Sequence, residues 1–426
     1  MNILVLGGGG REHALAWNMK ERGAGKHRLF IAPGNPGTAQ CGENVDIAIT
    51  DFERLGNFCL DNKIEMVIAG PEEPLVKGAW DYFQKDELRS IHFIGPSQFG
   101  AQLEGSKAFA KAFMNRHQIP TAAYREFSAE QFEEGVNYLK AHSLPVVLKA
   151  DGLAAGKGVV ICETHADAII EFEAMLVQAK FGDASKKVVV EQFLDGIELS
   201  VFILTDGKDY VLLPEAKDYK RIGEKDTGLN TGGMGAVSPV PFANDDFMQK
   251  VTERIIKPTV AGLAKEQINY TGFVFIGLIK VNNEPYVIEY NCRMGDPETE
   301  VVMPRLKNDL AELCLAAAEH RLRNIHIETD QRAAATVVAV SGGYPGAFEK
   351  GYKITGLDGA GERSIIFQAG TKQQEGEVVT NGGRVLCATS FASNIPEAVA
   401  ASKEALSRIK FDEMYFRKDI GYEFAD

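Results

Sequence analysis

Short apolar runs alternate with segments of helical spacing over the first hundred residues. The predicted strands cover residues 2–6, 28–32, 46–49, 66–69 and 92–94, and the predicted helices cover residues 12–21, 52–62 and 74–85. Such alternation is typical of a parallel sheet with helices on both faces. The chain therefore begins with an α/β domain.

The pattern changes after a Lys/Ala-rich helix predicted at 105–117. A mixed α+β module follows, with helices predicted at 132–141 and 166–180 and strands at 145–149, 159–162 and 188–193. Residues 223–241 are rich in glycine, threonine and proline without periodicity, which predicts a long loop. A loop of that length in a compact domain is usually functional or disordered.

The remaining chain alternates again between strands and helices. Predicted helices cover 251–265, 309–321 and 396–409, and predicted strands cover 272–281, 286–291, 333–340, 365–368 and 384–389. The sequence pattern changes near residue 325, where Gly/Pro turns begin to separate the predicted strands. With 426 residues, the chain suggests two to four domains.

Charge and cysteine content narrow the classes of function. A formal charge of −13 disfavours a nucleic-acid or membrane-surface partner, because both are polyanionic. No apolar run approaches the roughly 18 residues of a membrane span, and we expect a cytoplasmic protein. The six cysteines lie far apart without a Cys-x-x-Cys pair, so neither a zinc site nor a disulfide framework is indicated.

Four consecutive glycines, residues 7–10, follow the first predicted strand. A dinucleotide site needs Gly-x-Gly-x-x-Gly and an acidic residue after the second strand. Position 12 is Glu, and the second strand ends without a carboxylate, which disfavours NAD. A helix N-terminus that binds phosphate with help from Arg11 remains, as does a tight turn that binds nothing.

A second glycine loop spans Lys149 to Gly158. It is not a P-loop, because the glycine spacing is too short and a strand follows in place of a helix. A strand, a glycine loop and a strand form a hairpin that can fold over a triphosphate. Lys149 and Lys157 would then meet the phosphate oxygens.

Two further stretches carry chemistry. Backbone groups around Glu191 and Phe193 can meet an adenine edge, although this pattern is weak alone.

On the strand at 286–291, a period of two places Glu289, Asn291 and Arg293 on one face. This face is opposite to Ile288, Tyr290 and Cys292. Carboxylate and amide oxygens suit Mg²⁺, and an arginine can neutralise a transferring phosphoryl group.

Seven short motifs, each occurring once, are spread over nearly the whole chain. They occupy residues 7–14, 33–37, 70–72, 149–158, 218–221, 230–235 and 291–299, and the chain end at 417–421 fits the same series. In these motifs the chain resembles the ATP-grasp superfamily and, within it, the glycinamide ribonucleotide synthetases of purine biosynthesis. Cys292 and Met294 are small departures from the expected residues.

The resemblance implies an α/β plus α+β fold in three parts. Residues 1–104 would form the N-terminal parallel-sheet domain that binds the substrate phosphate, and residues 105–322 the ATP-grasp core, with a mobile hairpin subdomain at about 121–194. Residues 323–426 would form a small C-terminal α+β domain. The implied reaction joins glycine to 5-phosphoribosylamine through glycyl phosphate, with ATP as co-substrate and Mg²⁺ or Mn²⁺ as the metal.

The resemblance also assigns candidate residues to each substrate. Arg293 and Lys157 would be catalytic, and Glu289 and Asn291 would bind the metal. The ATP-binding residues would be Lys107, Lys149, Gly156, Lys157, Gly158, Glu191, Phe193, Leu194 and Glu198. The residues binding glycine and phosphoribosylamine would be Gly9, Gly10, Arg11, Asn35, Gly37, Asp218, Gly233, Arg293, Gly295, Asp296 and Pro297.

Three alternatives remain open at this point. One is another ATP-grasp ligase, such as a carboxylase acting on a purine intermediate or a peptide ligase. The second is a nucleotide-sensing protein without turnover, and the third is an NAD-dependent oxidoreductase. Under the favoured reading the partners are small molecules, with no nucleic acid or membrane and with transient contacts to neighbouring purine-pathway enzymes.

Overall fold

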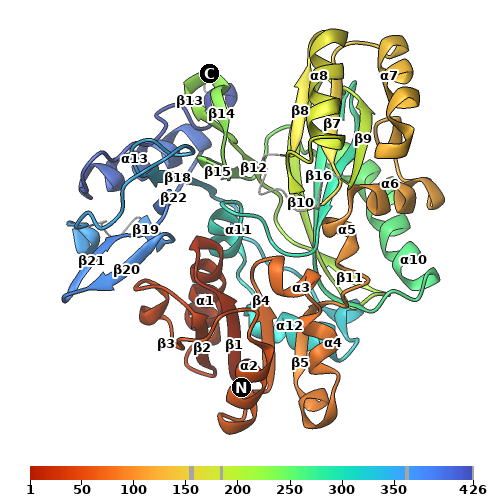
Figure 1. Cartoon of the computed structure of the whole chain (residues 1–426). Helices are drawn as coiled ribbons and strands as arrows, with labels where there is room; N and C mark the ends of the chain where they lie inside the picture. Colours follow the sequence, from red (N-terminus) through yellow and green to blue (C-terminus); the bar gives the residue numbers. More distant parts are fainter. Residues whose placement is uncertain (153–157, 183–185, 360–363, 425–426) are drawn as a thin grey trace.

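The computed structural model describes residues 1–152, 158–182, 186–359 and 364–424. A nine-stranded sheet forms its centre (Figure 1). Its parallel half has the order β5-β4-β1-β2-β3. These strands are β1 (Asn2–Gly7), β2 (Arg28–Pro33), β3 (Glu43–Asn44), β4 (Met66–Ala69) and β5 (His92–Pro96).

Helices cover both faces of this parallel half, as the sequence predicts. α1 (Gly10–Gly23) packs on the face that holds Ile3 and Val5. α2 (Phe52–Asp61), α3 (Glu73–Val76) and α4 (Ala79–Phe83) pack on the opposite face. β1, β2, β4 and β5 are therefore buried on both sides, which explains their continuous apolar sequences, whereas the edge strand β3 is exposed.

Three local predictions in this region are wrong. The third strand is Glu43–Asn44, and residues 46–49 turn away although Ile47 enters the core. The helix predicted at 74–85 is interrupted at Gly78, whose φ of 84° lies in the left-handed region. The helix predicted at 105–117 divides into α5 (Gln102–Gly105) and α6 (Lys107–Arg116), because Ser106 has extended backbone and caps α6.

The central sheet continues into an antiparallel half. β16 (Tyr270–Val281) pairs with β5 and also with β10 (Ile197–Thr205) and β17 (Glu284–Asn291), and β11 (Tyr210–Leu212) pairs with β10. α9 (Asp245–Val251), a π-helical turn (Thr252–Ile256) and α10 (Lys257–Lys265) cover one face, and α12 (Leu310–Ala318) covers the other. The sequence pattern did not predict β10, and the helix predicted at 309–321 is shorter than expected.

A separate four-stranded sheet forms the hairpin subdomain. Its antiparallel order is β6-β9-β7-β8, with β6 (Tyr124–Ser128), β7 (Val146–Ala150), β8 (Val159–Cys162) and β9 (Lys187–Gln192). α7 (Phe132–Ala141) and α8 (His165–Leu176) cover it (Figure 1). Its buried side chains form their own cluster, distinct from the two larger cores.

The C-terminal sheet takes strands from two parts of the chain. Its order is β12-β15-β18-β22-β19, with β12 (Lys217–Asp218), β15 (Gly235–Ser238), β18 (Ala333–Val340), β19 (Ser364–Gln368) and β22 (Arg384–Ala392). α13 (Ile395–Ser407) packs on β18 and β22. Two hairpins complete this region, β13 (Arg221–Gly223) with β14 (Thr227–Asn230) and β20 (Thr371–Gln374) with β21 (Glu377–Thr380).

The prediction of a long loop at 223–241 is therefore wrong. β14 and β15 lie within it, and all four residues of β15 are buried because the strand pairs with β18. α11 (Thr299–Arg305) was also not predicted. Among the described residues, no helix is long and apolar enough to cross a membrane.

Candidate active site

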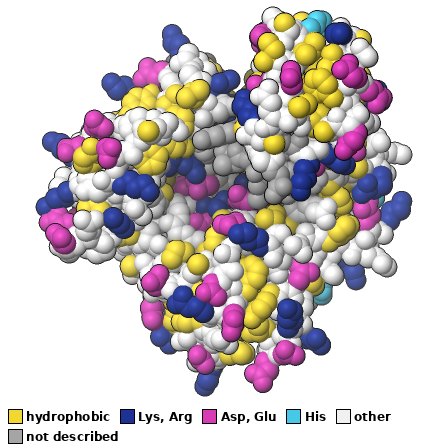
Figure 2. Space-filling view, in the orientation of Figure 1, with side chains coloured by type: hydrophobic (Ala, Val, Ile, Leu, Met, Phe, Trp, Pro, Cys, Tyr) yellow, Lys and Arg dark blue, Asp and Glu magenta, His cyan; other side chains and the backbone are white. Residues whose placement is uncertain are grey.

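The candidate site lies where the central sheet, the hairpin subdomain and the C-terminal sheet meet. The space-filling surface is hollowed between the lobe that carries α13 and the lobe that carries α7 and α8 (Figure 2). Charged side chains of both signs gather in this hollow. The loop after β1, the end of β17 and the start of β22 contribute residues to the site.

The first glycine loop is shaped by Glu12. Its Oε2 accepts a hydrogen bond of 2.7 Å from the N–H of Gly9. A Cβ at Gly7 or Gly70 would lie 2.4 or 2.2 Å from atoms of the Glu12 side chain. Glu12 thus occupies the space that these two glycines leave open, which gives a structural reason for an acidic residue in place of a third glycine.

Gly10, Asn35 and Gly37 support the same loop. A Cβ at Gly10 would lie 2.4 Å from Oε1 of the buried Glu300. Asn35 is buried, donates to the carbonyls of Gly8 and Gln368 at 2.9 and 2.8 Å, and accepts from Gly37 N at 2.7 Å. The Asn35 side chain therefore holds loops together and does not point freely into the hollow.

Arg11 and Arg293 converge on one carbonyl group. NH1 of each guanidinium donates to the oxygen of Met294 at 3.3 Å. Arg293 NH2 also donates to Glu104 at 2.7 Å and to Asn291 Oδ1 at 3.2 Å. Burial acts to lower the pKa of both arginines, but neighbouring carboxylates raise it above its usual value. This arrangement supplies permanent positive charge beside β17.

The candidate metal ligands lie on one face of β17, as predicted. A bulge makes Ile288 the extra residue, because Gly277 pairs with Glu289 while Leu278 pairs with Val287. Val287, and not Ile288, therefore shares the buried face with Tyr290 and Cys292. The prediction for Ile288 was wrong, since a bulge depends on the partner strand.

The side chains of Glu289 and Asn291 fit a hard cation. Burial acts to raise the pKa of Glu289, but Lys220, Lys149, Lys107 and Arg293 hold it below its usual value, so the group stays ionised. Asn291 is buried, and its Nδ2 has no hydrogen-bond partner among the described residues. Carboxylate and amide oxygens are the donors that Mg²⁺ and Mn²⁺ prefer. The unpaired Nδ2 is a hydrogen-bond donor, so it calls for an acceptor such as a phosphate oxygen and not for the cation itself.

Lys149 lies in a buried cluster with Glu191 and Lys111. Oε2 of Glu191 lies 3.0 Å from Nζ of Lys149 and 3.1 Å from Nζ of Lys111. Its Oε1 is buried without a partner among the described residues. Burial lowers the pKa of Lys111 to about 8, although Glu191 acts to raise it. Lys149 also donates to the carbonyl of Ile288 at 3.3 Å, which links the hairpin subdomain to β17.

The base of the second glycine loop is tied to α6. Lys107 Nζ donates to Gly152 O at 3.1 Å, and Asp151 Oδ1 accepts from Ser106 Oγ at 3.0 Å. Gly158 O accepts from Ala150 N at 2.8 Å and closes the hairpin. The predicted residues Gly156 and Lys157 lie outside the described residues.

The predicted adenine and ribose residues follow β9. Phe193 and Leu194 form the link to β10, and their backbone groups make no hydrogen bond to the described residues. Glu198, at the start of β10, pairs with Lys220 at 2.5 Å. This ion pair lowers the pKa of Glu198.

Asp218 and Glu298 form an acidic pair near Lys220. Burial raises the pKa of Asp218, and burial together with Asp218 raises the pKa of Glu298 to about 7. Glu298 Oε1 accepts from Ser200 Oγ at 3.0 Å. A Cβ at Gly295 would lie 2.4 Å from Glu298 Oε2, so the glycine makes room for this carboxyl group.

Asp296 and Pro297 complete the loop after β17. A Cβ at Gly233, whose φ is 120°, would lie 2.4 Å from Cδ of Pro297, so the two loops pack closely. Arg384 reaches Asp296 from the C-terminal sheet, with 3.0 Å between NH1 and Oδ1. The predicted substrate residues Gly9, Gly233, Gly295, Asp296 and Pro297 therefore lie together.

Sequence reasoning missed several residues of this site. They are Lys111, Lys220, Glu298, Glu300 and Arg384. Lys220 lies inside the 218–221 motif, and Glu298 and Glu300 lie in or beside the 291–299 motif, so attention to charge there could have found these three. Lys111 and Arg384 carry no comparable local signal, because α6 and β22 reach the site only in the folded chain.

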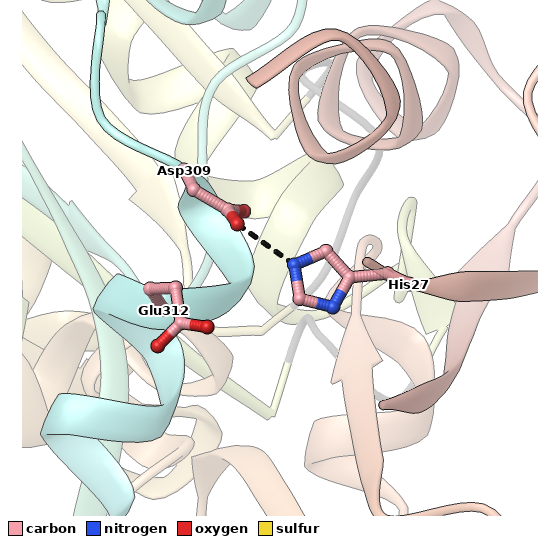
Figure 3. Close-up of side chains that lie close together, drawn as sticks. All are labelled: His27, Asp309 and Glu312. Carbon is pink, nitrogen blue, oxygen red and sulfur yellow. Dashed lines mark hydrogen bonds and ion pairs between the residues drawn. The ribbon is translucent and has the colours of Figure 1, made fainter. Parts of the chain in front are cut away.

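A second cluster lies at another domain contact (Figure 3). His27, Asp309 and Glu312 place their ligand atoms within 4.8 Å of one another. His27 Nε2 lies 2.7 Å from Asp309 Oδ2, while Asp309 Oδ1 accepts from Ala311 N at 3.0 Å and caps α12. Both oxygens of Asp309 are thus engaged, and the pair connects the segment before β2 to α12.

The two halves of this geometry define a class of enzyme. The β7–β8 hairpin, which carries the buried Lys149, faces β17 with its carboxylate and amide and the arginine just after it, and this is the arrangement of an ATP-grasp enzyme. Family models for phosphoribosylglycinamide synthetase match the chain in three pieces: the N domain at residues 1–104, the ATP-grasp (A) domain at 105–299 and the C domain at 334–423. The chain belongs to this family.

Individual relatives agree with the family match. The chain is 46% identical over 426 residues to a phosphoribosylamine–glycine ligase of Vibrio vulnificus, covering 99% of this chain and 98% of the relative. A crystal structure of phosphoribosylamine–glycine ligase from Thermotoga maritima has a TM-score of 0.84 at 33% identity, covering 98% of this chain and 100% of that chain.

A more distant structure shares the fold alone. The biotin carboxylase domain of Hydrogenobacter thermophilus 2-oxoglutarate carboxylase, crystallised with MgADP, has a TM-score of 0.71 at 19% identity. It covers 97% of this chain and 91% of that chain.

Proposed function

We propose that this chain catalyses the ATP-dependent ligation of glycine to 5-phosphoribosylamine. The products are glycinamide ribonucleotide, ADP and phosphate, and the reaction is the second step of de novo purine (IMP) biosynthesis. The observation that carries this proposal is the match to three consecutive phosphoribosylglycinamide synthetase domains. Full-length relatives named for this activity support it.

The reaction has two displacements. A carboxylate oxygen of glycine attacks the γ-phosphorus of ATP, and the bond to the β-phosphate oxygen breaks to give glycyl phosphate and ADP. The amine of phosphoribosylamine then attacks the acyl carbon, the C–O bond to phosphate breaks, and the amine loses one proton. No side-chain nucleophile is needed, so catalysis consists of positioning and charge neutralisation.

The first displacement brings two anions together, and the site supplies the charges that offset their repulsion. In the proposed roles, Lys107, Lys149 and Lys157 contact the ATP phosphates and Arg293 contacts the transferring phosphoryl group. Glu289 and Asn291 would hold Mg²⁺ or Mn²⁺, which supplies further positive charge to the phosphates when it is bound. Gly156 and Gly158 would let the loop backbone approach the triphosphate closely.

The remaining candidate residues divide between the nucleoside and the other substrates. Backbone groups of Glu191, Phe193 and Leu194 would contact the adenine, and Glu198 the ribose. Gly9, Gly10 and Arg11 would face the phosphate of phosphoribosylamine, with Asn35 and Gly37 behind them. Asp218, Gly233, Gly295, Asp296 and Pro297 would border glycine and the acceptor amine.

Three domains would share these tasks. We propose that residues 1–104 bind the substrate phosphate, that 105–322 bind ATP through the core and the hairpin subdomain at about 121–194, and that 323–426 close the far side. The hairpin subdomain would exclude water, because glycyl phosphate hydrolyses readily. A cytoplasmic location and transient contacts with neighbouring purine-pathway enzymes belong to the same proposal.

A coupled ADP-release assay tests the function. The purified protein is given Mg²⁺ and ATP, and glycine and freshly generated phosphoribosylamine are each omitted in turn. Release that requires both substrates supports the proposal. Release with bicarbonate or D-alanine in place of glycine would indicate another ATP-grasp ligase. ATP binding without turnover in the complete mixture would indicate a nucleotide sensor, and tight NAD binding an oxidoreductase.

A further inference from the structure

Arg384 is a cation of the C-terminal sheet that reaches the candidate substrate site. It begins β22, and its NH1 group meets three acceptors. They are Asp296 Oδ1 at 3.0 Å, Asp296 O at 2.8 Å and Gly232 O at 2.7 Å. Within the described part of the chain, its Nε and NH2 donate no hydrogen bond. One nitrogen thus joins the 230–235 loop, the loop after β17 and β22.

A glycine makes this approach possible. A Cβ at Gly232 would lie 2.9 Å from Cζ of Arg384 and 3.1 Å from NH2. A side chain at this position would force the guanidinium to shift. Gly232 therefore leaves open the space that the guanidinium occupies beside Asp296.

The ion pair uses only one oxygen of the Asp296 carboxylate. Oδ2 accepts no hydrogen bond from the described residues and lies 3.7 Å from the position of a Cβ on Gly9. It is thus on the side of the first glycine loop. A free carboxylate oxygen accepts hydrogen bonds from amines and hydroxyl groups, and phosphoribosylamine carries both.

We propose that Arg384 is a positioning residue for the second displacement. By holding Oδ1 of Asp296, it directs Oδ2 toward the first glycine loop, where Oδ2 accepts a hydrogen bond from the amine or a ribosyl hydroxyl of phosphoribosylamine. The C-terminal domain thereby completes the acceptor site. This inference rests on the proposed function and adds a residue that none of the assignments above includes.

The pairing also has an electrostatic consequence. An unpaired Asp296 carboxylate would repel the phosphate of the acceptor and the phosphate that leaves from glycyl phosphate. Arg384 offsets this charge while leaving Oδ2 able to accept a hydrogen bond. Loss of Arg384 should therefore weaken acceptor binding and should spare the first displacement.

Arg384→Met and Arg384→Lys test the proposal in the full-length enzyme with Mg²⁺. For Arg384→Met, we expect the KM for phosphoribosylamine to rise at least about tenfold while the KM values for ATP and glycine stay within about twofold. Arg384→Lys keeps the charge without the forked geometry, and we expect it to recover part of the loss. Lys353→Met is the control, because Lys353 is a C-terminal-domain cation that is 59% exposed and pairs with Glu377.

The first displacement can be followed without the acceptor. Exchange of ¹⁸O between the bridging and non-bridging positions of the ATP β-phosphate, with glycine alone, reports reversible formation of glycyl phosphate. We expect this exchange to be unchanged in Arg384→Met. An equal loss of exchange and of acceptor use would overturn the proposal, since it would indicate a general structural role.

A double-mutant cycle tests whether Arg384 acts through Asp296. We expect Asp296→Asn to raise the KM for phosphoribosylamine and the double variant to be no worse than Asp296→Asn alone. Additive effects would overturn the route through Asp296. An unchanged KM in Arg384→Met, measured beside an active wild type, would defeat this inference only. A wild type without dependence on glycine and phosphoribosylamine would instead defeat the proposed function.

Discussion

Glu289 is the residue on which the candidate metal site depends most. It is the carboxylate of the proposed ligand pair, and four cations around it keep it ionised despite burial. A buried ionised carboxylate is costly to maintain unless cations surround it, and the unpaired Nδ2 of Asn291 beside it is costly unless an acceptor such as a phosphate oxygen binds there.

Glu289→Ala should abolish metal-dependent turnover and leave the fold intact. We expect the ADP-release rate to fall on the order of 100-fold or more, because both charge and a ligand are lost. Thermal unfolding and circular dichroism should match the wild type. A folded Glu289→Ala enzyme with normal activity would contradict the assignment of Glu289 as a metal ligand.

His13 makes the contact between α1 and the C-terminal sheet sensitive to acid. Its Nδ1 accepts a hydrogen bond of 2.9 Å from Gln368 N, so the ring is neutral in the folded protein. Burial lowers the pKa of His13 from 6.5 to about 4. The unfolded chain binds a proton in this window and the folded chain does not.

Stability should therefore fall as the pH decreases from about 6.5 toward 4. The contribution of His13 is fully present above the unfolded pKa, and its loss reaches about 3 kcal/mol once the pH has passed through the folded value. Urea unfolding at a series of pH values measures this slope. His13→Gln should flatten it, and a slope identical to that of the wild type would show that other groups cause the pH dependence.

At the scale of elements, the N-terminus of α6 links helix capping to the ATP site. Ser106 Oγ accepts from Phe109 N at 3.0 Å and donates to Asp151 Oδ1 at 3.0 Å. Asp151 directly precedes Gly152, whose carbonyl binds Lys107. The cap thus fixes both the helix and the base of the second glycine loop.

Ser106→Ala should lower the free energy of unfolding by about 1 kcal/mol and raise the KM for ATP several-fold. Thr164→Ala is a matched control. Thr164 caps α8 through Asp167 N at 3.1 Å and donates to Asp167 Oδ2 at 2.7 Å, so both of these hydrogen bonds stay within the first turn of α8. Its loss should cost similar stability and leave the KM for ATP unchanged. Equal changes in KM for both variants would contradict the proposed link.

Some strands could be predicted from the local sequence pattern and others could not. β1 and β4 were predicted because strands buried on both faces have short apolar sequences that need no partner to be recognised. β10 was missed although residues 199–204 are mostly apolar. β15 was missed because its pairing with β18 joins residues about one hundred positions apart.

In the candidate site too, features set by the local sequence could be predicted, and features that depend on distant segments could not. The spacing of Glu289 and Asn291 within one strand predicted their common face, and Arg293, just beyond the end of β17, lies beside Asn291. The ion pair of Arg384 with Asp296 and the cluster of Lys111, Glu191 and Lys149 could not be predicted in this way, because each joins elements that meet only in the folded chain. The bulge at Ile288 likewise depends on β16.

At the scale of the whole molecule, two kinds of connection hold the parts together. The N-terminal and central parts share one sheet through β5 and β16, and the C-terminal sheet receives β12 and β15 from the middle of the chain. The hairpin subdomain differs, because it has its own sheet and its own core. Polar contacts such as Lys149 Nζ to Ile288 O tie it to the rest.

This difference predicts that the hairpin subdomain opens and unfolds as a unit of its own. Leu139 is fully buried in its core, so Leu139→Ala should destabilise that core by about 2–5 kcal/mol. Amides of β6, β7 and β9 should then exchange with deuterium at least about 30-fold faster, while those of β1 and β4 stay unchanged.

Leu4→Ala, in the core of the central sheet, is the reciprocal control and should leave the subdomain amides unaffected. If Leu139→Ala accelerated exchange equally in β1 and β9, the subdomain and the central sheet would be one cooperative unit, and movement of the subdomain as a separate body during ATP binding would have no basis in its packing.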